Sequence, residues 1–307
     1  MKDAYRRAEN PEISAPIHAM WIGVDEWLES LPHDTSRLGQ DIAWSPVFTE
    51  QPYKPGRAHL DRMWRFNDGP SWLGGPALLP LPEWPRRPDG KPLAHVASIN
   101  LWDVWGTAHE ENKEAFPEHA EGLPTTGYLE VFHDLVDTWG WETEDRDAGG
   151  WLVRWVPEPE EKRLADPPAD ADQPNDACQA GMFLSGWSSR PPLDFRSDRA
   201  AADAAAAVQE AWQLSWWVQR TRKTTDVARA VTHVYGYSQN DSAPALRVLR
   251  DVLPLDEGDS HRLILDIASD TYLFGWFGDG AALEVWMRTS DLAARRFDRA
   301  WCITRTD

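Results

Sequence analysis

The side chains best suited to chemistry in this chain are nine histidines and two cysteines, and their spacing does not indicate a metal site. A zinc-binding helix of the metalloprotease type needs a second His one turn after the first, and His109-Glu-Glu-Asn lacks it. The other histidines show no ligand spacing, and Cys178 and Cys302 lie far apart in the sequence. We therefore predict no metal ion and no other cofactor.

Serine and carboxylate residues give no stronger indication of catalysis. The run Ser185-Gly-Trp-Ser188 lacks the Gly-x-Ser-x-Gly frame of a nucleophile elbow. Two of Asp270, Asp279 and Glu284 could form an acid/base pair near the end of the chain. However, Asp279-Gly280 is typical of a turn, and Glu284 is expected at the outward position of a strand. We therefore predict no catalytic residue.

Two short segments of strand-like sequence each occur twice in the chain, and they indicate the main elements of the fold. Gly127-Tyr-Leu-Glu-Val-Phe132 recurs as Ala281-Ala-Leu-Glu-Val-Trp286. His95-Val-Ala-Ser-Ile-Asn-Leu101 precedes the first copy, and Leu263-Ile-Leu-Asp-Ile-Ala-Ser269 precedes the second. Short apolar runs rich in β-branched and aromatic residues favour strands. The repetition predicts an α+β fold with an internally duplicated antiparallel β-sheet core and peripheral helices.

Composition along the chain divides it into four segments that we expect to form one compact domain. Residues 1–70 are predicted to hold an N-terminal helix, at 17–31, and a Trp- and Pro-rich irregular segment packed on the core. Residues 71–157 form the first β-rich half. Residues 158–178 have the composition of an acidic, Pro-rich linker. Residues 179–307 form the second half, with closing strands and with a long helix that is capped by Ser197 or Asp198 and runs to about residue 223.

The overall composition excludes several classes of protein. Hydrophobic residues make up 42%, with nineteen Trp, so the chain can bury a large core. A net charge of −19 argues against nucleic-acid binding. We expect neither a signal peptide nor a membrane-spanning segment, because no long apolar run follows the polar N-terminal residues or occurs elsewhere. With two cysteines, reduced thiols in a cytoplasmic protein are the simplest interpretation.

Negative charge is concentrated in the middle of the chain. Residues 109–178 contain nineteen Asp and Glu but five Lys and Arg, a net charge of −14. An acidic surface with aromatic anchors suits the capture of a basic protein, because charge raises the association rate and aromatic rings supply binding energy. A solvated acidic loop is the rival interpretation. The candidate partner-binding residues are Glu110, Glu111, Glu114, Glu118, Trp139, Trp141, Glu142, Glu144, Asp145 and Asp147.

Several runs in the two halves follow one another in the order found in a known family. They are Gly74–Leu93, Ile99–Leu101, His233–Tyr237, Leu263–Asp270 and Gly275–Trp286, continued by Asp291–Cys302. Over about residues 70–135 and 225–304 the chain thus resembles the YwqG-like family of uncharacterised bacterial proteins. The resemblance implies an α+β fold with an internally repeated antiparallel sheet and no established catalytic residue. Members often occur beside secreted toxins, which implies an immunity role.

This chain departs from the family pattern inside the repeated strands. The family phrases usually carry a Gln where this chain has Ser98 and Asp266, and an Asp where it has Ala268. If the family shares a polar feature between its halves, this chain has altered it.

These observations predict a cytosolic protein-binding protein rather than an enzyme. The leading hypothesis is an immunity protein, or antitoxin, that neutralises a secreted bacterial toxin through its acidic, Trp-containing surface. The alternative is an enzyme or a small-ligand binder, for example of glycans, with a site in a cleft between the two halves. A scaffolding subunit is a third hypothesis. The partner and the oligomeric state are left open.

Overall fold

The computed structural model describes most of the chain between residues 28 and 305. The described residues are 28–29, 34–38, 41–50, 56–66, 69–107, 122–160, 163–171, 178–221, 230–269 and 282–305. The helix predicted at 17–31 lies outside the described residues except for its positions 28–29.

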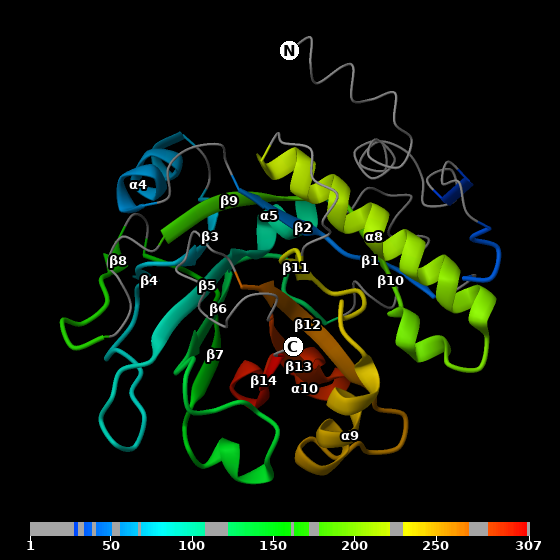
Figure 1. Cartoon of the computed structure of the whole chain (residues 1–307). Coiled ribbons are helices and arrows are strands. Elements are labelled where there is room, and N and C mark those ends of the chain that lie inside the picture. The colour runs from blue at the N-terminus through cyan, green and yellow to red at the C-terminus, as the bar shows by residue number, and fades with distance from the viewer. Residues whose placement is uncertain are drawn as a thin grey trace.

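Ten strands form one antiparallel sheet that holds both predicted halves (Figure 1). Each strand pairs antiparallel with its neighbour, as expected from the alternation of turns and short apolar runs. In spatial order the strands are β14 (Trp301–Arg305), β13 (Ala282–Arg288), β12 (His261–Ala268), β11 (His233–Val234), β2 (Val47–Glu50), β9 (Cys178–Leu184), β3 (Ser71–Gly74), β5 (Ala94–Asn100), β6 (Tyr128–His133) and β7 (Trp151–Val156).

The sheet nearly closes on itself, because its first and last strands approach each other. The Trp151 indole N–H, on β7, donates to the Ala300 carbonyl oxygen just before β14, at 3.1 Å. The rings of Trp151 and Trp301 lie 4.9 Å apart, edge to face. These tryptophans therefore seal the seam between the edge strands. Two small two-stranded sheets add β1 (Ile42–Trp44) with β10 (Trp187–Ser189), and β4 (Ala77–Leu78) with β8 (Leu164–Ala165).

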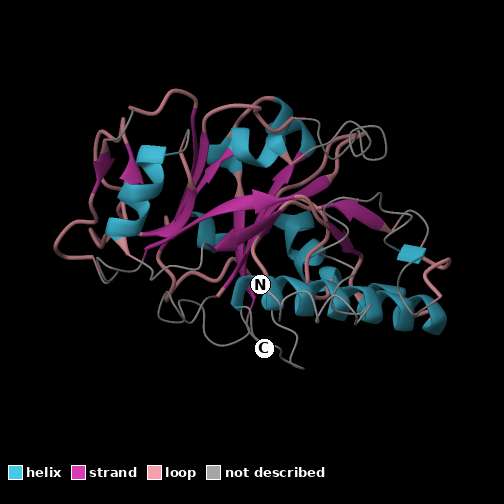
Figure 2. Ribbon diagram, turned by 90° about the horizontal axis from the view of Figure 1, so that it is seen from above, coloured by secondary structure: helices cyan, strands magenta, loops and turns pink. Residues whose placement is uncertain are grey.

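Helices pack against both faces of the sheet. The long helix α8 (Arg199–Thr221) lies across the side of β2 and β10 (Figures 1 and 2). Its start confirms the predicted cap, since the Ala201 N–H donates to the Asp198 carboxylate at 3.1 Å. The other helices are α4 (Arg57–Phe66), α5 (Leu101–Gly106), α9 (Ser242–Val252), α10 (Thr289–Ala293) and the 3₁₀ turns η1 (Thr143–Arg146), η2 (Pro192–Phe195) and η4 (Phe297–Arg299).

The segment expected to be irregular before residue 70 contains regular structure instead. It supplies β1, β2 and α4, and β2 lies in the middle of the large sheet. Strands of three and four residues show too few alternations for a period to be recognised in the sequence. The predicted linker at 158–178 also contributes a strand, β8, which pairs with β4 of the first half.

Side chains alternate along β6 and β13 between an inner and an outer apolar cluster. Leu129 and Val131 of β6 and Leu283 and Val285 of β13 all belong to one inner cluster. The residues between them face outer clusters, which helices and loops cover. Both faces of these strands are therefore buried, so even outward positions are removed from water.

The strand pairs β5–β6 and β12–β13 have the same pairing register and a bulge at the same place. Ser98 pairs with Glu130 on one side, and Asp266 pairs with Glu284 on the other. The register shifts between His95 and Ala97 in β5, and between Leu263 and Leu265 in β12. The repeated phrases of the sequence thus occupy matching positions in two strand pairs.

Both cysteines are buried free thiols. Burial raises the pKa of Cys178 to about 12 and also raises that of Cys302. Because the thiolate is the reactive form, we expect the native protein at pH 8 not to react with a disulfide reagent such as DTNB, while the unfolded protein releases two equivalents. Release of a full equivalent by the native protein, at the rate of the unfolded chain, would contradict this expectation.

Candidate functional site

The acidic residues predicted to bind a partner lie in part on the loop between β6 and β7, residues 134–150. This loop, named here the acidic loop, holds six Asp and Glu residues and one Arg, a net charge of −5. The side chains of Glu142, Glu144 and Asp147 are exposed, and Asp145 is half-buried. The loop also exposes two large apolar side chains, Val136 at 67% and Trp139 at 41%. Charge and apolar surface therefore lie on the same loop.

Hydrogen bonds from β14 hold the acidic loop in place. The Thr304 N–H donates to the Trp139 carbonyl oxygen at 2.9 Å, and the Trp301 indole donates to the Gly140 carbonyl oxygen at 2.8 Å. Gly140 has a φ of 76°, and a Cβ there would lie 1.8 Å from the Cys302 carbonyl oxygen. Only glycine permits this approach, so the loop is held against the sheet edge rather than extended into solvent.

Trp141 differs from Trp139 in its role. Its indole N–H donates to the Thr304 carbonyl oxygen at 3.0 Å, and the Arg305 guanidinium lies 5.5 Å from its ring centre. The side chain is half-buried and packs on an outer apolar cluster. Of the two predicted aromatic anchors, Trp139 is therefore the exposed one, and Trp141 fastens the loop.

Ion pairs neutralise carboxylates at the start of the acidic loop, whereas carboxylates further along it remain unpaired among the described residues. Arg87 pairs with Asp134 at 3.2 Å and with Asp137 at 2.5 Å. Within the described part of the chain, Glu142, Glu144 and Asp147 form no ion pair. The unpaired negative charge thus gathers around η1. The predicted residues Glu110, Glu111, Glu114 and Glu118 lie outside the described residues.

A second set of polar residues, not predicted from the sequence, is buried in the outer face of the sheet. Its first member is Glu130 on β6, which is fully buried. Its carboxylate accepts hydrogen bonds from the Leu78 N–H, the Ser98 hydroxyl and the Arg154 Nε, each at 2.8 Å. Arg154 also donates to the carbonyl oxygens of Leu78 and Pro80. This cluster fastens β4 to β6 and β7.

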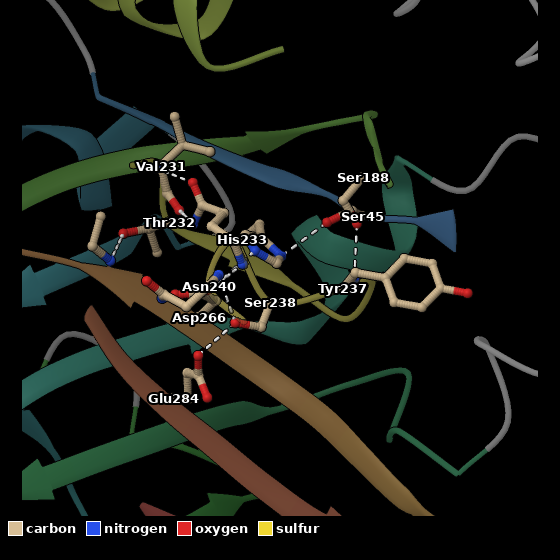
Figure 3. A network of polar contacts seen from close by, with 12 residues as sticks. Ser45, Ser188, Val231, Thr232, His233, Tyr237, Ser238, Asn240, Asp266 and Glu284 are labelled. Atoms are coloured by element: carbon tan, nitrogen blue, oxygen red, sulfur yellow. Dashed lines mark hydrogen bonds and ion pairs between the residues drawn. The ribbon is translucent and has the colours of Figure 1, made fainter. Parts of the chain in front are cut away.

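The matching residue of the second strand pair, Glu284, is also fully buried. Figure 3 shows it below Ser238, to which it is hydrogen-bonded. It accepts from the Ser238 hydroxyl at 2.5 Å and the Trp286 indole at 2.9 Å. Asp266 lies opposite it on β12 and approaches the Nε2 of His233 at 3.4 Å. Glu284 was expected at the outward position of a strand, and that position is not exposed to solvent. The face is the outer one, but neighbouring elements cover it.

The pKa values of the two glutamates are shifted in opposite directions. Burial alone would raise the pKa of Glu130, but hydrogen bonding and charge from His95 and Arg154 outweigh burial and lower it. Burial, together with the charge of Asp266, raises the pKa of Glu284. The residues opposite the two glutamates also differ. A hydroxyl, Ser98, faces Glu130, whereas a second carboxylate faces Glu284.

Ser45, His233 and Asp266 lie in a row that has the composition of a hydrolase triad. The Ser45 hydroxyl lies 2.9 Å from the His233 Nδ1, and Asp266 lies beside the other ring nitrogen. The same Nδ1 lies 2.8 Å from the Tyr235 carbonyl oxygen, so backbone competes with the serine for it. All three side chains are fully buried, so no substrate reaches the hydroxyl. We therefore assign this row a structural role.

One signal in the sequence could have located both buried clusters. Each repeated phrase carries a Glu in the middle of an apolar strand, at Glu130 and at Glu284. A charged residue in a strand that is apolar on both faces needs buried partners. The partners themselves come from distant segments, and no local spacing reveals them.

Neither a metal site nor a membrane-spanning helix is found among the described residues. Among the described residues, no group of three or more His, Cys, Asp or Glu side chains is arranged to hold a metal ion. In the same part of the chain, every helix is too short or too polar to span a bilayer. Asp270 and Asp279, once considered as partners of Glu284, lie outside the described residues.

Comparison with known proteins identifies the family. A comparison with curated proteins gave no match. Residues 71–305 match the family model described as a domain of unknown function, DUF1963. The match runs from the first residue of β3 to the last residue of β14, and it includes the acidic loop and both buried glutamates. Since it covers well over half of the chain, this protein belongs to the DUF1963 family.

Proposed function

We propose that the protein binds a basic protein partner through the acidic loop. One observation carries the proposal: unpaired carboxylates and exposed apolar side chains lie together on a loop that is held against a sheet edge. The carboxylates are those of Glu142, Glu144 and Asp147, and the apolar side chains are those of Val136 and Trp139.

The two kinds of side chain contribute differently to binding. Exposed charges at the rim of an interface mainly raise the association rate, and salt screens this effect. A Trp that becomes buried on binding supplies a large part of the affinity. Because β14 already orders the loop, little conformational entropy is lost when a partner binds.

Within this function, an immunity role in the cytoplasm is the specific form we favour. Its support is the resemblance to YwqG-like proteins, which often occur beside secreted toxins, and the negative surface, which suits a basic toxin domain. Neutralisation then requires no chemistry, because a bound partner blocks the toxin's own site. The same resemblance leads us to place the chain with the YwqG-like proteins inside its family.

We also propose that the sheet arose by internal duplication. The repeated phrases, the shared register and the matching bulges support it. So does the strand order, in which β3-β5-β6-β7 and β11-β12-β13-β14 flank the central pair β9 and β2. An experimental structure in which the backbones of 71–156 and 233–305 fail to superpose would contradict the duplication without affecting the binding proposal.

Charge reversal of the acidic loop tests the proposed function. The variant Glu142→Lys/Glu144→Lys/Asp147→Lys is expected to lose the partner that the wild-type protein captures from lysate of the source cells. With the purified partner, we expect its association rate to fall roughly tenfold or more at low salt. The single variant Trp139→Ala is expected to weaken binding by about 2 kcal/mol, mainly through faster dissociation. Biosensor kinetics at two salt concentrations measure both effects.

A matched control separates this loop from general negative charge. The variant Glu210→Lys/Asp256→Lys/Glu257→Lys makes the same change of charge at exposed positions on α8 and before β12. It should capture the partner as the wild type does. Equal capture by the loop variant and the control would remove the acidic loop from the function.

A further inference from the structure

A cleft of about 520 Å³ lies beside the strand pair β12–β13. None of its lining residues belongs to the acidic loop. Its walls are η2 and the residues that flank it, one side of α9 from Ser242 to Arg250, the turn at 236–238, and β12 with Trp286 of β13. All of these lie in the second half of the chain, so the cleft is not the one expected between the halves. Its volume is that of sites for small organic ligands.

The charge of the cleft is opposite to that of the chain. Four arginines line it, Arg190, Arg196, Arg250 and Arg262, with Asp194 as the one carboxylate in the lining. The whole chain has a net charge of −19. Arginines gathered from three separate elements in so acidic a protein indicate a local site for negative charge.

Some of this positive charge is already paired. Arg196 meets Asp241 at 2.6 Å, and Arg190 meets Asp41 at 3.3 Å. Arg250 is different, because its exposed side chain donates through Nε to the Leu246 carbonyl oxygen and forms no ion pair with any described residue. Asp194, the carboxylate in the lining, lies 3.9 Å from Arg190 and forms no ion pair with Arg250. The guanidinium of Arg250 thus remains available for a ligand.

The cleft also presents apolar surface. Leu193, on η2 in the cleft lining, is 57% exposed. Leu246 adds half-buried apolar lining, whereas Leu263 and Trp286 line the cleft but are only 2% and 6% exposed. A purely inorganic anion would leave Leu193 uncovered, so the lining suits a ligand with an apolar part.

We propose that this cleft binds a small organic anion, in which a carboxylate or phosphate group is attached to a ring-sized apolar body. The planar guanidinium of Arg250 binds either group through paired, charge-assisted hydrogen bonds. The apolar body covers Leu193 and the lining around Trp286. The site contains no residue of the acidic loop, so each of the two proposals can be contradicted without affecting the other.

Binding of simple probes to the full-length protein tests the site. The probes are phenyl phosphate, benzoate, inorganic phosphate and the neutral benzyl alcohol, titrated by isothermal calorimetry and protein-observed NMR at low salt. We expect phenyl phosphate or benzoate to bind, with the tighter of the two identifying the anionic group. Inorganic phosphate should bind at least about tenfold more weakly than phenyl phosphate, because it lacks the apolar part. Benzyl alcohol should not bind detectably.

Two surface variants assign binding to the cleft. Arg250→Glu is expected to weaken phenyl phosphate and inorganic phosphate roughly tenfold to a hundredfold, as a lost charge-assisted hydrogen bond does. Leu193→Asp should weaken phenyl phosphate more than inorganic phosphate. The control Arg199→Glu, at an exposed arginine of α8, should change nothing. Thermal unfolding confirms that each variant is folded.

The proposal is overturned if no anionic probe binds wild-type protein at millimolar concentration, or if Arg250→Glu binds phenyl phosphate as tightly as Arg199→Glu does. Equal binding of benzyl alcohol and phenyl phosphate would also overturn it, because the cleft would then bind apolar rings without regard to charge.

Discussion

Replacing Arg154 with methionine is expected to lower the free energy of unfolding by about 3–5 kcal/mol, since it leaves a buried carboxylate without its cation. Glu130 is fully buried, and the Arg154 side chain that pairs with it is 19% exposed. Methionine fills similar space, but it also leaves the carbonyl oxygens of Leu78 and Pro80 without the donor they have now. Urea unfolding followed by tryptophan fluorescence measures the loss.

The pH dependence of this variant identifies the cause. The pKa of Glu130 is now lowered, and without Arg154 it is expected to rise, because burial is the largest opposing influence. The variant should therefore regain stability relative to wild type as the pH falls and the carboxyl becomes protonated. The double variant Glu130→Gln/Arg154→Met should lose less than the sum of the two single variants.

A surface arginine provides the control. Arg163 pairs with Glu160, but its side chain is 71% exposed. Arg163→Met should change stability by less than about 1 kcal/mol. If Arg154→Met is no more destabilising than this control, the Glu130 cluster is not the fastening that its contacts indicate.

Replacing Asp103 with asparagine is expected to stabilise the protein above pH 7 by up to about 3 kcal/mol. Burial raises the pKa of Asp103 from 3.8 to about 6, although the Phe183 N–H donates to its carboxylate at 2.8 Å. The folded protein therefore holds this proton more tightly than the unfolded chain does. The stabilisation from proton binding is complete below pH 3.8 and is lost as the pH rises to about 6. An asparagine oxygen keeps the hydrogen bond to Phe183 and carries no charge at any pH.

Urea unfolding at pH 3.5 and at pH 8 checks this prediction. The gain should appear at pH 8 and nearly vanish at pH 3.5, where the wild-type carboxyl is protonated too. Asp203→Asn, at a side chain that is 76% exposed, should show little change at either pH. An equal effect of Asp103→Asn at both pH values would mean that packing, and not charge, determines its stability.

The sequence by itself determined the elements whose signal is local. The phrases around Glu130 and Glu284 became β6 and β13, and their preceding phrases became β5 and β12. The long helix begins beside its predicted cap at Asp198 and ends at Thr221, close to the predicted end. The acidic character of the loop at 134–150 is likewise a property of composition. Each of these signals lies within a few neighbouring residues, so the sequence displays it directly.

Only the tertiary structure decided how distant segments meet. It placed the short strand β2 beside β9 in the centre of the sheet, where the sequence indicated irregular structure. It covered the outer face of β13, so Glu284, which was expected at an outward strand position, is buried. It also assigned Trp139 to the surface and Trp141 to the seam with β14. Strand pairing and burial depend on contacts between residues far apart in the chain, and such contacts leave no period in the sequence.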